Sequence, residues 1–358
     1  MRKIILIAIS VVVVLAAIAG GLWWYFMGKP LYEPGMVRAG SSLRAPLAPP
    51  PQGQAGATDF WTVEPDIQLH HFSEGKGKAV LVVHGGPGAP YLHPWAGLAP
   101  LTGSYRFHYY DQRGCGRSTR PIDTFTSSNT YENMLTLDKT LGLGAQLADI
   151  ERIRRILGED KLILVGHSFG GFLAALYAAE FPEHVEALIL IAPADLLVMP
   201  QADGGLFEVV RKRLPEDMQA DYAAYLKDYL DFQGLFARSE AELVSVNQGF
   251  AKYYGVAMGS GSSGSIPEQG QAGGWMVPAL YMSMGTRHDY RAALGKVNAP
   301  VLVIHGANDL QPEAASRAYV EAFPNARFQV IPNATHFPFE EQPGEFAAVV
   351  GKFLSELK

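Results

Sequence analysis

Residues 161–170 read KLILVGHSFG, in which a short apolar run leads into the pattern G-x-S-x-G around Ser168. An apolar run of this length predicts a buried strand, and the residues that follow, Phe169–Phe181, predict a helix that ends before a proline. Glycines at positions 166, 170 and 171 allow the strand and the helix to approach closely. A serine on such a strand–turn–helix is typical of a nucleophile exposed at the end of a strand. We therefore predict that Ser168 is a catalytic nucleophile.

The alternation of strand and helix extends over residues 58–358. A lead-in hairpin is predicted at Asp59–Glu64 and Asp66–Phe72, and further strands at Ala79–His84, Arg106–Tyr110, Glu186–Ile191, Pro300–Ile304 and Phe328–Ile331. Further helices are predicted at Gly144–Leu157, Pro312–Phe323 and Gly344–Leu357. This pattern predicts the α/β class, with a mostly parallel sheet that carries helices on both faces.

Residues 195–296 interrupt the alternation. They contain a Gly/Ser-rich loop, Gly259–Gly274, and three predicted helices, at Phe207–Leu214, Gln219–Leu230 and Ser239–Tyr254. A long insertion between two core strands predicts a helical cap over the carboxyl ends of the strands, where open α/β sheets bind ligands. The core domain would then consist of residues 58–194 and 297–358.

The amino-terminal segment, residues 1–27, has the character of a membrane anchor. Ile4–Met27 contains no charged side chain, and as a helix of 1.5 Å per residue it would span about 36 Å, enough to cross a bilayer. The alternative is a signal peptide cleaved after Ala17-Ile18-Ala19, which would release a secreted protein. Both interpretations place the body outside the cytoplasm. Residues 28–57 are rich in proline and predict an extended linker to the folded body.

The composition excludes several classes of function. The 358 residues are 48% apolar and 18% charged, with a formal net charge of −6, so nucleic acid is not expected as a partner. The single cysteine, Cys115, excludes an internal disulfide framework and a cysteine-rich metal site. The sequence has no H-E-x-x-H motif or clustered ligand set, and we expect neither a metal nor an organic cofactor. The expected substrate is a small molecule or a short peptide.

A nucleophilic serine needs a base, and the base needs an orienting carboxylate. In the expected fold, the chain order is serine, acid, histidine. His336 follows the last predicted strand, and Asp309 follows the strand before it. Asp195, after the strand Glu186–Ile191, is the alternative acid. The candidate triad is therefore Ser168, Asp309 and His336.

The same chemistry needs two backbone N–H groups that stabilise an oxyanion. One is predicted to be the N–H of Phe169, the residue after the nucleophile. The second is expected in the loop His84–Gly88 (HGGPG), which follows the strand Ala79–His84. We predict Gly86 as the donor, with Gly85 as the alternative. The following proline fixes this turn and is a candidate for a cis peptide bond.

The motifs resemble those of the proline iminopeptidases, which are serine peptidases of the α/β-hydrolase fold. His84–Gly88 (HGGPG), Asp111–Ser118 (DQRGCGRS), Ala148–Leu157 (ADIERIRRIL) and the serine turn occur in the order seen in that family. The resemblance implies that Ser168, Asp309 and His336 form the triad. It also implies that the Asp111–Ser118 loop shapes the floor of the site, with Cys115 as a small packed residue.

Two features depart from that family. The serine turn carries His167 and Phe169, where the family usually has G-G-S-W-G. The family also grips the free amine of its substrate with cap glutamates beside a tryptophan, whereas the cap here has Trp275 and no glutamate after it. The available cap glutamates are expected to lie on solvated faces; they are Glu208, Glu240, Glu242 and Glu268. The sequence thus leaves open an aminopeptidase and an esterase of small or lipid-like acyl esters.

Overall fold

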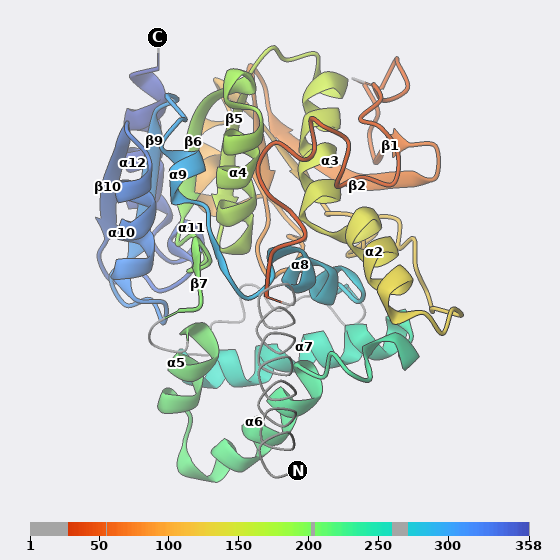
Figure 1. The fold of residues 1–358 in the computed structure, drawn as a ribbon. Coiled ribbons are helices and arrows are strands. Elements are labelled where there is room, and N and C mark those ends of the chain that lie inside the picture. The colour runs from red at the N-terminus through yellow and green to blue at the C-terminus, as the bar shows by residue number, and fades with distance from the viewer. Residues whose placement is uncertain (1–27, 55, 202–204, 260–270, 358) are drawn as a thin grey trace, which may run out of the picture.

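The computed structural model describes residues 28–54, 56–201, 205–259 and 271–357 (Figure 1). An eight-stranded sheet forms the centre, in the order β1-β2-β4-β3-β5-β6-β9-β10. The strands are β1 (Phe60–Glu64), β2 (Ile67–Gly75), β3 (Lys78–Val83), β4 (Tyr105–Tyr110), β5 (Leu162–His167), β6 (Val185–Ile191), β9 (Val301–Gly306) and β10 (Ala326–Ile331). β1 and β2 form an antiparallel hairpin, β2 pairs antiparallel with β4, and all pairs from β4 to β10 are parallel. The predicted mostly parallel sheet is confirmed.

Helices cover both faces of the sheet, as predicted, because consecutive strand residues point to opposite sides. In β5, Leu162 and Leu164 pack into one apolar cluster, whereas Ile163 and Val165 pack into the other. The first cluster is covered by α3 (Leu143–Leu157), α4 (Phe169–Glu180) and α10 (Glu313–Ala322). The second is covered by the 3-10 helix η1 (Ala96–Leu101), α11 (Pro338–Glu341) and α12 (Pro343–Ser355). Two short 3-10 helices complete the set, η2 (Pro182–His184) and η3 (Leu235–Ala237).

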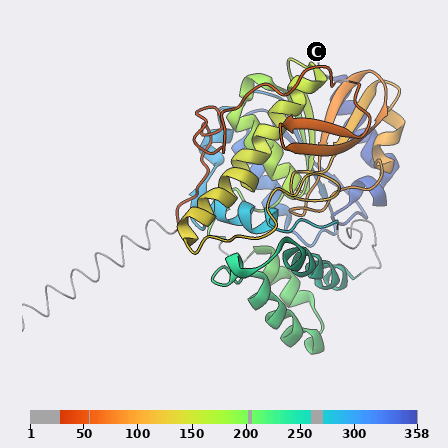
Figure 2. The ribbon, with the colours of Figure 1, turned by 90° about the vertical axis from the view of Figure 1, so that its right-hand side faces the viewer.

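Three helices form a separate layer next to the sheet (Figure 2). They are α5 (Gly205–Arg213), α6 (Glu216–Tyr229) and α7 (Glu240–Ala257), and they share a small apolar cluster of their own. A two-stranded antiparallel sheet, β7 (Val198–Met199) with β8 (His288–Asp289), joins the two chain segments that lead into and out of this layer. We call α5–α7 the cap.

The predicted cap range of 195–296 needs a correction, because its last part packs in the core. Trp275, together with residues of α8 (Met276–Met284), belongs to the large cluster on the sheet, and so does Leu294 at the end of α9 (Arg291–Leu294). α8 packs against α2 (Thr130–Leu141), a helix that the sequence patterns did not predict. Most of the predicted Gly/Ser-rich loop, residues 260–270, lies outside the described residues.

Residues 28–57, predicted as an extended linker, include a part that packs on the domain, residues 28–47, which we call the strap. Tyr32 and Val37 in the strap are 0% exposed. The backbone N–H groups of Leu31 and Tyr32 donate to the carbonyl of Ser283 at the end of α8. The strap then runs across α4 and α3, shown in red in Figure 1. The strap is fixed because apolar side chains such as Tyr32 and Val37 pack into the large apolar cluster on the sheet. Its prolines do not prevent this burial.

The predicted membrane segment, Ile4–Met27, lies outside the described residues. Among the residues that the structure describes, none of the helices has the length and apolarity needed to cross a bilayer.

Candidate active site

Ser168 occupies a strained turn between β5 and α4. Its backbone has φ 54° and ψ −122°, a conformation that residues with a Cβ rarely adopt. The surrounding backbone holds it there, because its N–H donates to the carbonyl of Ile191 at 2.9 Å and its carbonyl accepts from Ala194 N–H at 3.0 Å. Strain that is held by such contacts is common at functional sites. The turn has the form expected of a nucleophile elbow.

The glycines of the turn are required by close backbone approaches. A Cβ on Gly166 would overlap the carbonyl oxygen of Gly170. A Cβ on Gly170 would overlap the carbonyl oxygen of Val83, at the end of the neighbouring strand β3. The turn therefore brings Ser168 to the end of β3, where the HGGPG loop begins.

Asp309 and His336 form a buried, hydrogen-bonded pair. His336 Nδ1 lies 2.9 Å from Asp309 Oδ2 and 3.1 Å from Oδ1, and the Asp309 side chain is 0% exposed. A carboxylate can only accept, so Nδ1 carries a proton, and in the corresponding imidazole tautomer the lone pair is on Nε2. Asp309 Oδ1 also accepts from the backbone N–H of Gln311 at 3.0 Å, which orients the carboxylate. The carboxylate within hydrogen-bond distance of His336 is that of Asp309.

The HGGPG loop passes directly beside Ser168. A Cβ on Gly85 would lie 2.8 Å from the Cβ of Ser168. The carbonyl of Gly85 accepts hydrogen bonds from His84 Nδ1–H at 3.0 Å and from Ala89 N–H at 3.1 Å. Because the Gly85–Gly86 peptide is trans, the N–H of Gly86 points in the direction opposite to the Gly85 carbonyl. The Gly86–Pro87 bond is cis, as the sequence suggested.

Two backbone N–H groups at this point have no partner among the described residues. Within the described part of the chain, no hydrogen-bond acceptor is found for the backbone N–H of Gly86 or for that of Phe169. Phe169 is the first residue of α4, where helix geometry leaves N–H groups unpaired. Unpaired donors beside a nucleophile can bind an oxyanion.

The sequence of residues 78–343 matches the alpha/beta hydrolase fold family. The chain belongs to this family. The matched residues include the strands from β3 to β10, the serine elbow after β5 and the Asp309–His336 pair in the loops after β9 and β10.

Curated relatives and solved structures agree with this assignment. The chain is 26% identical over 315 residues to a proline iminopeptidase of Heyndrickxia coagulans, covering 81% of this chain and 96% of the relative. It is 26% identical over 294 residues to a proline iminopeptidase of Saccharolobus solfataricus, with 79% and 87% covered. An esterase structure from Thermogutta terrifontis superposes with a TM-score of 0.53 at 22% identity, covering 81% of this chain and 94% of that one. The protein is a hydrolase of the alpha/beta hydrolase fold.

The loop Asp111–Ser118 of this hydrolase supports the HGGPG loop from below. The backbone N–H of Gln112 donates to His84 Nε2 at 3.0 Å, and its side-chain amide donates to the carbonyl of His84 at 2.8 Å. Burial lowers the pKa of His84, so its ring is neutral, with the proton on Nδ1. Cys115 is buried in the same loop, and burial raises the pKa of its thiol well above the usual range. Cys115 is therefore a packed residue and not a nucleophile.

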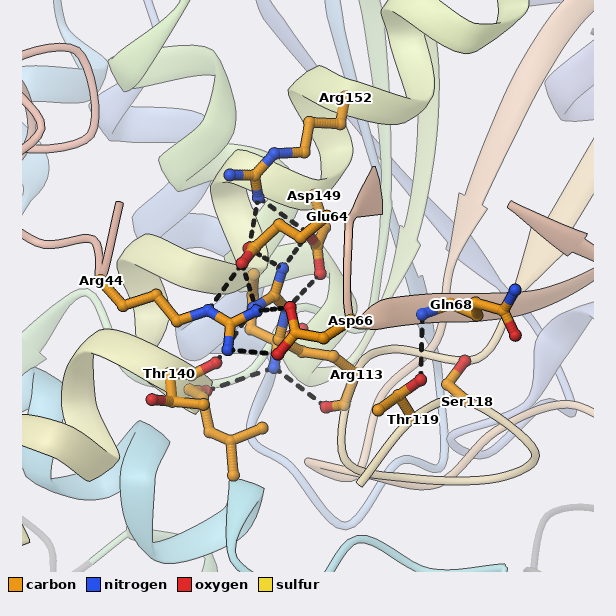
Figure 3. Close-up of polar contacts among 12 residues, drawn as sticks. Arg44, Glu64, Asp66, Gln68, Arg113, Ser118, Thr119, Thr140, Asp149 and Arg152 are labelled. Carbon is orange, nitrogen blue, oxygen red and sulfur yellow. Dashed lines mark hydrogen bonds and ion pairs between the residues drawn. The ribbon is translucent and has the colours of Figure 1, made fainter. Parts of the chain in front are cut away.

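A buried ion network anchors this loop to the rest of the hydrolase. Arg113 lies among the carboxylates of Asp149 and Glu64 (Figure 3). It donates to Asp149 from Nε at 2.6 Å and from Nη2 at 2.5 Å, which is a bidentate pair. Arg44 of the strap and Arg152 of α3 also contact Glu64. Four separate segments of the chain thus meet below the candidate site.

The cap contributes Tyr254, which sequence analysis missed. Its ring lies 5.9 Å from the ring of His336, at 69°. Leu310, next to the acid, is 3% exposed and belongs to the apolar cluster of the cap. Both contacts join segments far apart in the chain, so no local pattern pointed to them.

The described cap glutamates all have other partners. Glu208 pairs with Arg211 on the same exposed helix, and Glu242 forms a capping box with Ser239 at the start of α7. Glu240 is buried, pairs with Arg120 and accepts the backbone N–H of Trp275 at 2.7 Å. The prediction of a solvated face is therefore wrong for Glu240. Glu268 lies outside the described residues.

Proposed function

We propose that this hydrolase uses Ser168, His336 and Asp309 as a catalytic triad and works through an acyl-enzyme. The observation that carries the proposal is the buried hydrogen bond from His336 Nδ1–H to Asp309, which leaves the lone pair on Nε2. A base in this state can take the proton of a serine hydroxyl, and Ser168 is the serine on the strained elbow.

The proposed reaction has two halves. In the first, Ser168 Oγ attacks the substrate carbonyl carbon while its proton passes to His336 Nε2, and the N–H groups of Gly86 and Phe169 stabilise the oxyanion. The intermediate collapses to an ester on Ser168, and the leaving group takes the proton from His336. In the second, His336 removes a proton from water, which attacks the ester carbon. The acid product leaves, and Ser168 Oγ recovers its proton from His336.

The first candidate specificity is that of a proline iminopeptidase-like aminopeptidase, which removes an amino-terminal residue. Its support is the names of the curated relatives, together with the four sequence motifs of this chain that resemble those of the proline iminopeptidases. In this case the acyl group on Ser168 would be the removed residue, and the leaving group would be the shortened peptide.

The second candidate is an esterase for small or lipid-like acyl esters. It is favoured by the partners of the described cap glutamates. Glu240 is neutralised by Arg120, and Glu208 and Glu242 are engaged on their own helices, so none of the three is held ready for a substrate amine. Tyr254, the cap residue next to His336, presents an aromatic surface instead.

One set of assays tests both the catalytic triad and the substrate specificity. Ser168→Ala should abolish hydrolysis of prolyl arylamides and nitrophenyl esters, while Ser355→Ala, an exposed serine at the end of α12, should retain it. Unchanged hydrolysis in Ser168→Ala would refute the triad. Faster turnover of prolyl arylamides, lost when their amine is acetylated, would identify an aminopeptidase. Indifference to acetylation together with faster ester turnover would identify an esterase.

The proposal includes a membrane location for this hydrolase, anchored by Ile4–Met27 with the catalytic domain outside the cytoplasm. The apolar, uncharged character of that segment supports it. The structure describes the chain from Gly28, whose carbonyl accepts from Thr286 N–H at 3.1 Å, so the segment would join the domain beside the end of α8. Full-length protein should remain with membranes after alkaline extraction, and protein lacking residues 1–27 should be released. Release of the full-length protein at its full molecular mass would contradict an anchor.

A further inference from the structure

His167 is a buried residue that the proposed mechanism does not use. It is the last residue of β5, directly before Ser168, and it is 3% exposed. Its ring centroid lies 4.7 Å from that of His336, and both ring nitrogens are within hydrogen-bond distance of a partner. A buried histidine with two partners next to the base and the nucleophile calls for an explanation beyond packing.

The partners determine the tautomer of His167. Nε2 lies 2.8 Å from the carbonyl oxygen of His336, which can only accept, so Nε2 carries the proton. Burial lowers the pKa of His167 well below its usual range, so the ring is neutral and Nδ1 is an acceptor. Nδ1 lies 2.5 Å from the hydroxyl of Tyr91, and burial raises the pKa of that phenol, so Tyr91 O–H donates. The hydrogen bonds run in one direction, from Tyr91 through His167 to His336.

Tyr91 is itself held in place by aromatic packing. Its ring meets Trp95 edge-on at 4.9 Å and Phe339 at 6.0 Å. It follows the HGGPG loop in the chain, and its ring lies 6.3 Å from that of His84. The hydrogen-bond chain thus joins the three loops that supply the oxyanion donor, the nucleophile and the base.

We infer that His167 is a positioning residue that holds the His336 backbone in register with Ser168. The inference rests on the proposed function, because it assigns a task only if His336 is the base. The His167 ring is attached to the residue next to the nucleophile, so its bond to the His336 carbonyl sets the distance between base and serine directly. Small displacements of a catalytic group lower turnover more than they lower substrate binding.

The test compares His167→Leu with His167→Gln. Leucine fills the space and makes no hydrogen bond, so kcat should fall about 10- to 100-fold with KM changed less than about threefold. Glutamine carries an Nε2–H donor and an acceptor oxygen, so it should restore kcat to within about fivefold of the original. His108→Leu, which removes a buried histidine from β4 away from the triad, is the matched control and should keep kcat.

A milder variant covers the case in which His167→Leu folds poorly. Tyr91→Phe removes only the hydroxyl group and should lower kcat about three- to tenfold, with no further loss when combined with His167→Leu. The rate at which a fluorophosphonate labels Ser168 should fall in parallel with kcat in the folded fraction. Full kcat in either His167→Leu or Tyr91→Phe would overturn the inference, and so would equal losses in the leucine and glutamine variants. Ser168→Ala distinguishes a failure of this inference from a failure of the proposed function, because activity in that variant would refute the triad itself.

Discussion

The hydroxyl group of Tyr32 donates a 2.8 Å hydrogen bond to the carboxylate of Glu180, which lies 148 residues further along the chain. The same carboxylate accepts the backbone N–H of Gly35 at 2.6 Å and that of Arg38 at 2.9 Å. Glu180 is the last residue of α4, the helix that begins at the nucleophile elbow. One buried carboxylate therefore holds the strap against the helix that carries Ser168.

Replacing Glu180 with glutamine should destabilise the hydrolase. Glutamine offers one acceptor oxygen and places an NH₂ group where a donor already points, so at least one of these three donors loses its acceptor. The free energy of unfolding should fall by about 2–3 kcal/mol. Urea denaturation measures it, with Glu183→Gln as the control, since the exposed Arg38–Glu183 ion pair should contribute less than about 1 kcal/mol. Equal effects of the two variants would show that the strap is held by other contacts.

Gly306 should not tolerate alanine. A Cβ at this position, the end of β9, would overlap the carbonyl oxygen of Thr335, next to His336. The loops that carry Asp309 and His336 are also joined by a 2.8 Å hydrogen bond from Asn308 N–H to the carbonyl of Ala334. Gly306→Ala must therefore separate Asp309 from His336, and we expect kcat/KM to fall at least about 100-fold.

The control for this prediction is Gly344→Ala. Gly344 lies in the first turn of α12, where a Cβ would meet no atom within 4 Å. Alanine is the better helix former, so stability should be unchanged or slightly higher and activity unchanged. Normal kcat/KM in Gly306→Ala would mean that the two loops can separate without disturbing the pair.

Asp138 makes the hydrolase less stable at neutral pH than it would otherwise be. Burial raises the pKa of this carboxyl to about 6, and its Oδ1 has no partner among the described residues. The folded state therefore binds more protons than the unfolded state between about pH 4 and 6, and stability falls as the pH rises through that window. Asp138→Asn should raise the free energy of unfolding at pH 7 by about 1–3 kcal/mol and flatten its dependence on pH.

Chemical denaturation between pH 4 and 8 measures this effect. Asp160→Asn is the control, because Asp160 is exposed and its replacement should leave the curve unchanged. A lower stability of Asp138→Asn at pH 7 would show that the charged carboxylate is stabilised by its surroundings.

His71 should make the hydrolase sensitive to acid. It stacks on Trp61 at 3.7 Å, neither ring nitrogen has a partner within the described chain, and burial lowers its pKa to about 4. Below about pH 6.5 the unfolded chain takes up a proton on His71, whereas the folded chain does not. The contribution of His71 to the free energy of unfolding is therefore complete above pH 6.5 and is lost as the pH falls toward 4. The loss should reach about 2–3 kcal/mol.

His71→Phe tests the assignment, because phenylalanine keeps the stack on Trp61 and cannot be protonated. Its free energy of unfolding should fall less between pH 6.5 and 4 than that of the unchanged protein. His93→Phe, at an exposed position, should leave the acid dependence as it was. The same acid dependence in both variants would place its origin in other groups.

Patterns within short stretches determined much of this protein. The elbow at Ser168 could be predicted because a strand, two tight glycines and a helix are adjacent in the chain, and the strands because each is a run of apolar residues. His336 could be matched with Asp309 because, on a parallel sheet, the ends of neighbouring strands meet at the same edge. The predictions that rested on short sequence patterns and on the order of the strands therefore agree with the observed sheet.

The tertiary structure alone decided the rest. The strap has prolines and no periodicity, and only the partners of Tyr32 and Glu180 show that it is part of the domain. Glu240 has the sequence context of a surface residue and is buried against Arg120. In the sequence His167 is only a departure from the G-G-S-W-G pattern, and the structure shows its ring bonded to Tyr91 and to the carbonyl of His336. The physical reason is the same in each case: the state of a polar group depends on which donor or acceptor lies within 3 Å, and the fold brings that partner from a distant part of the chain.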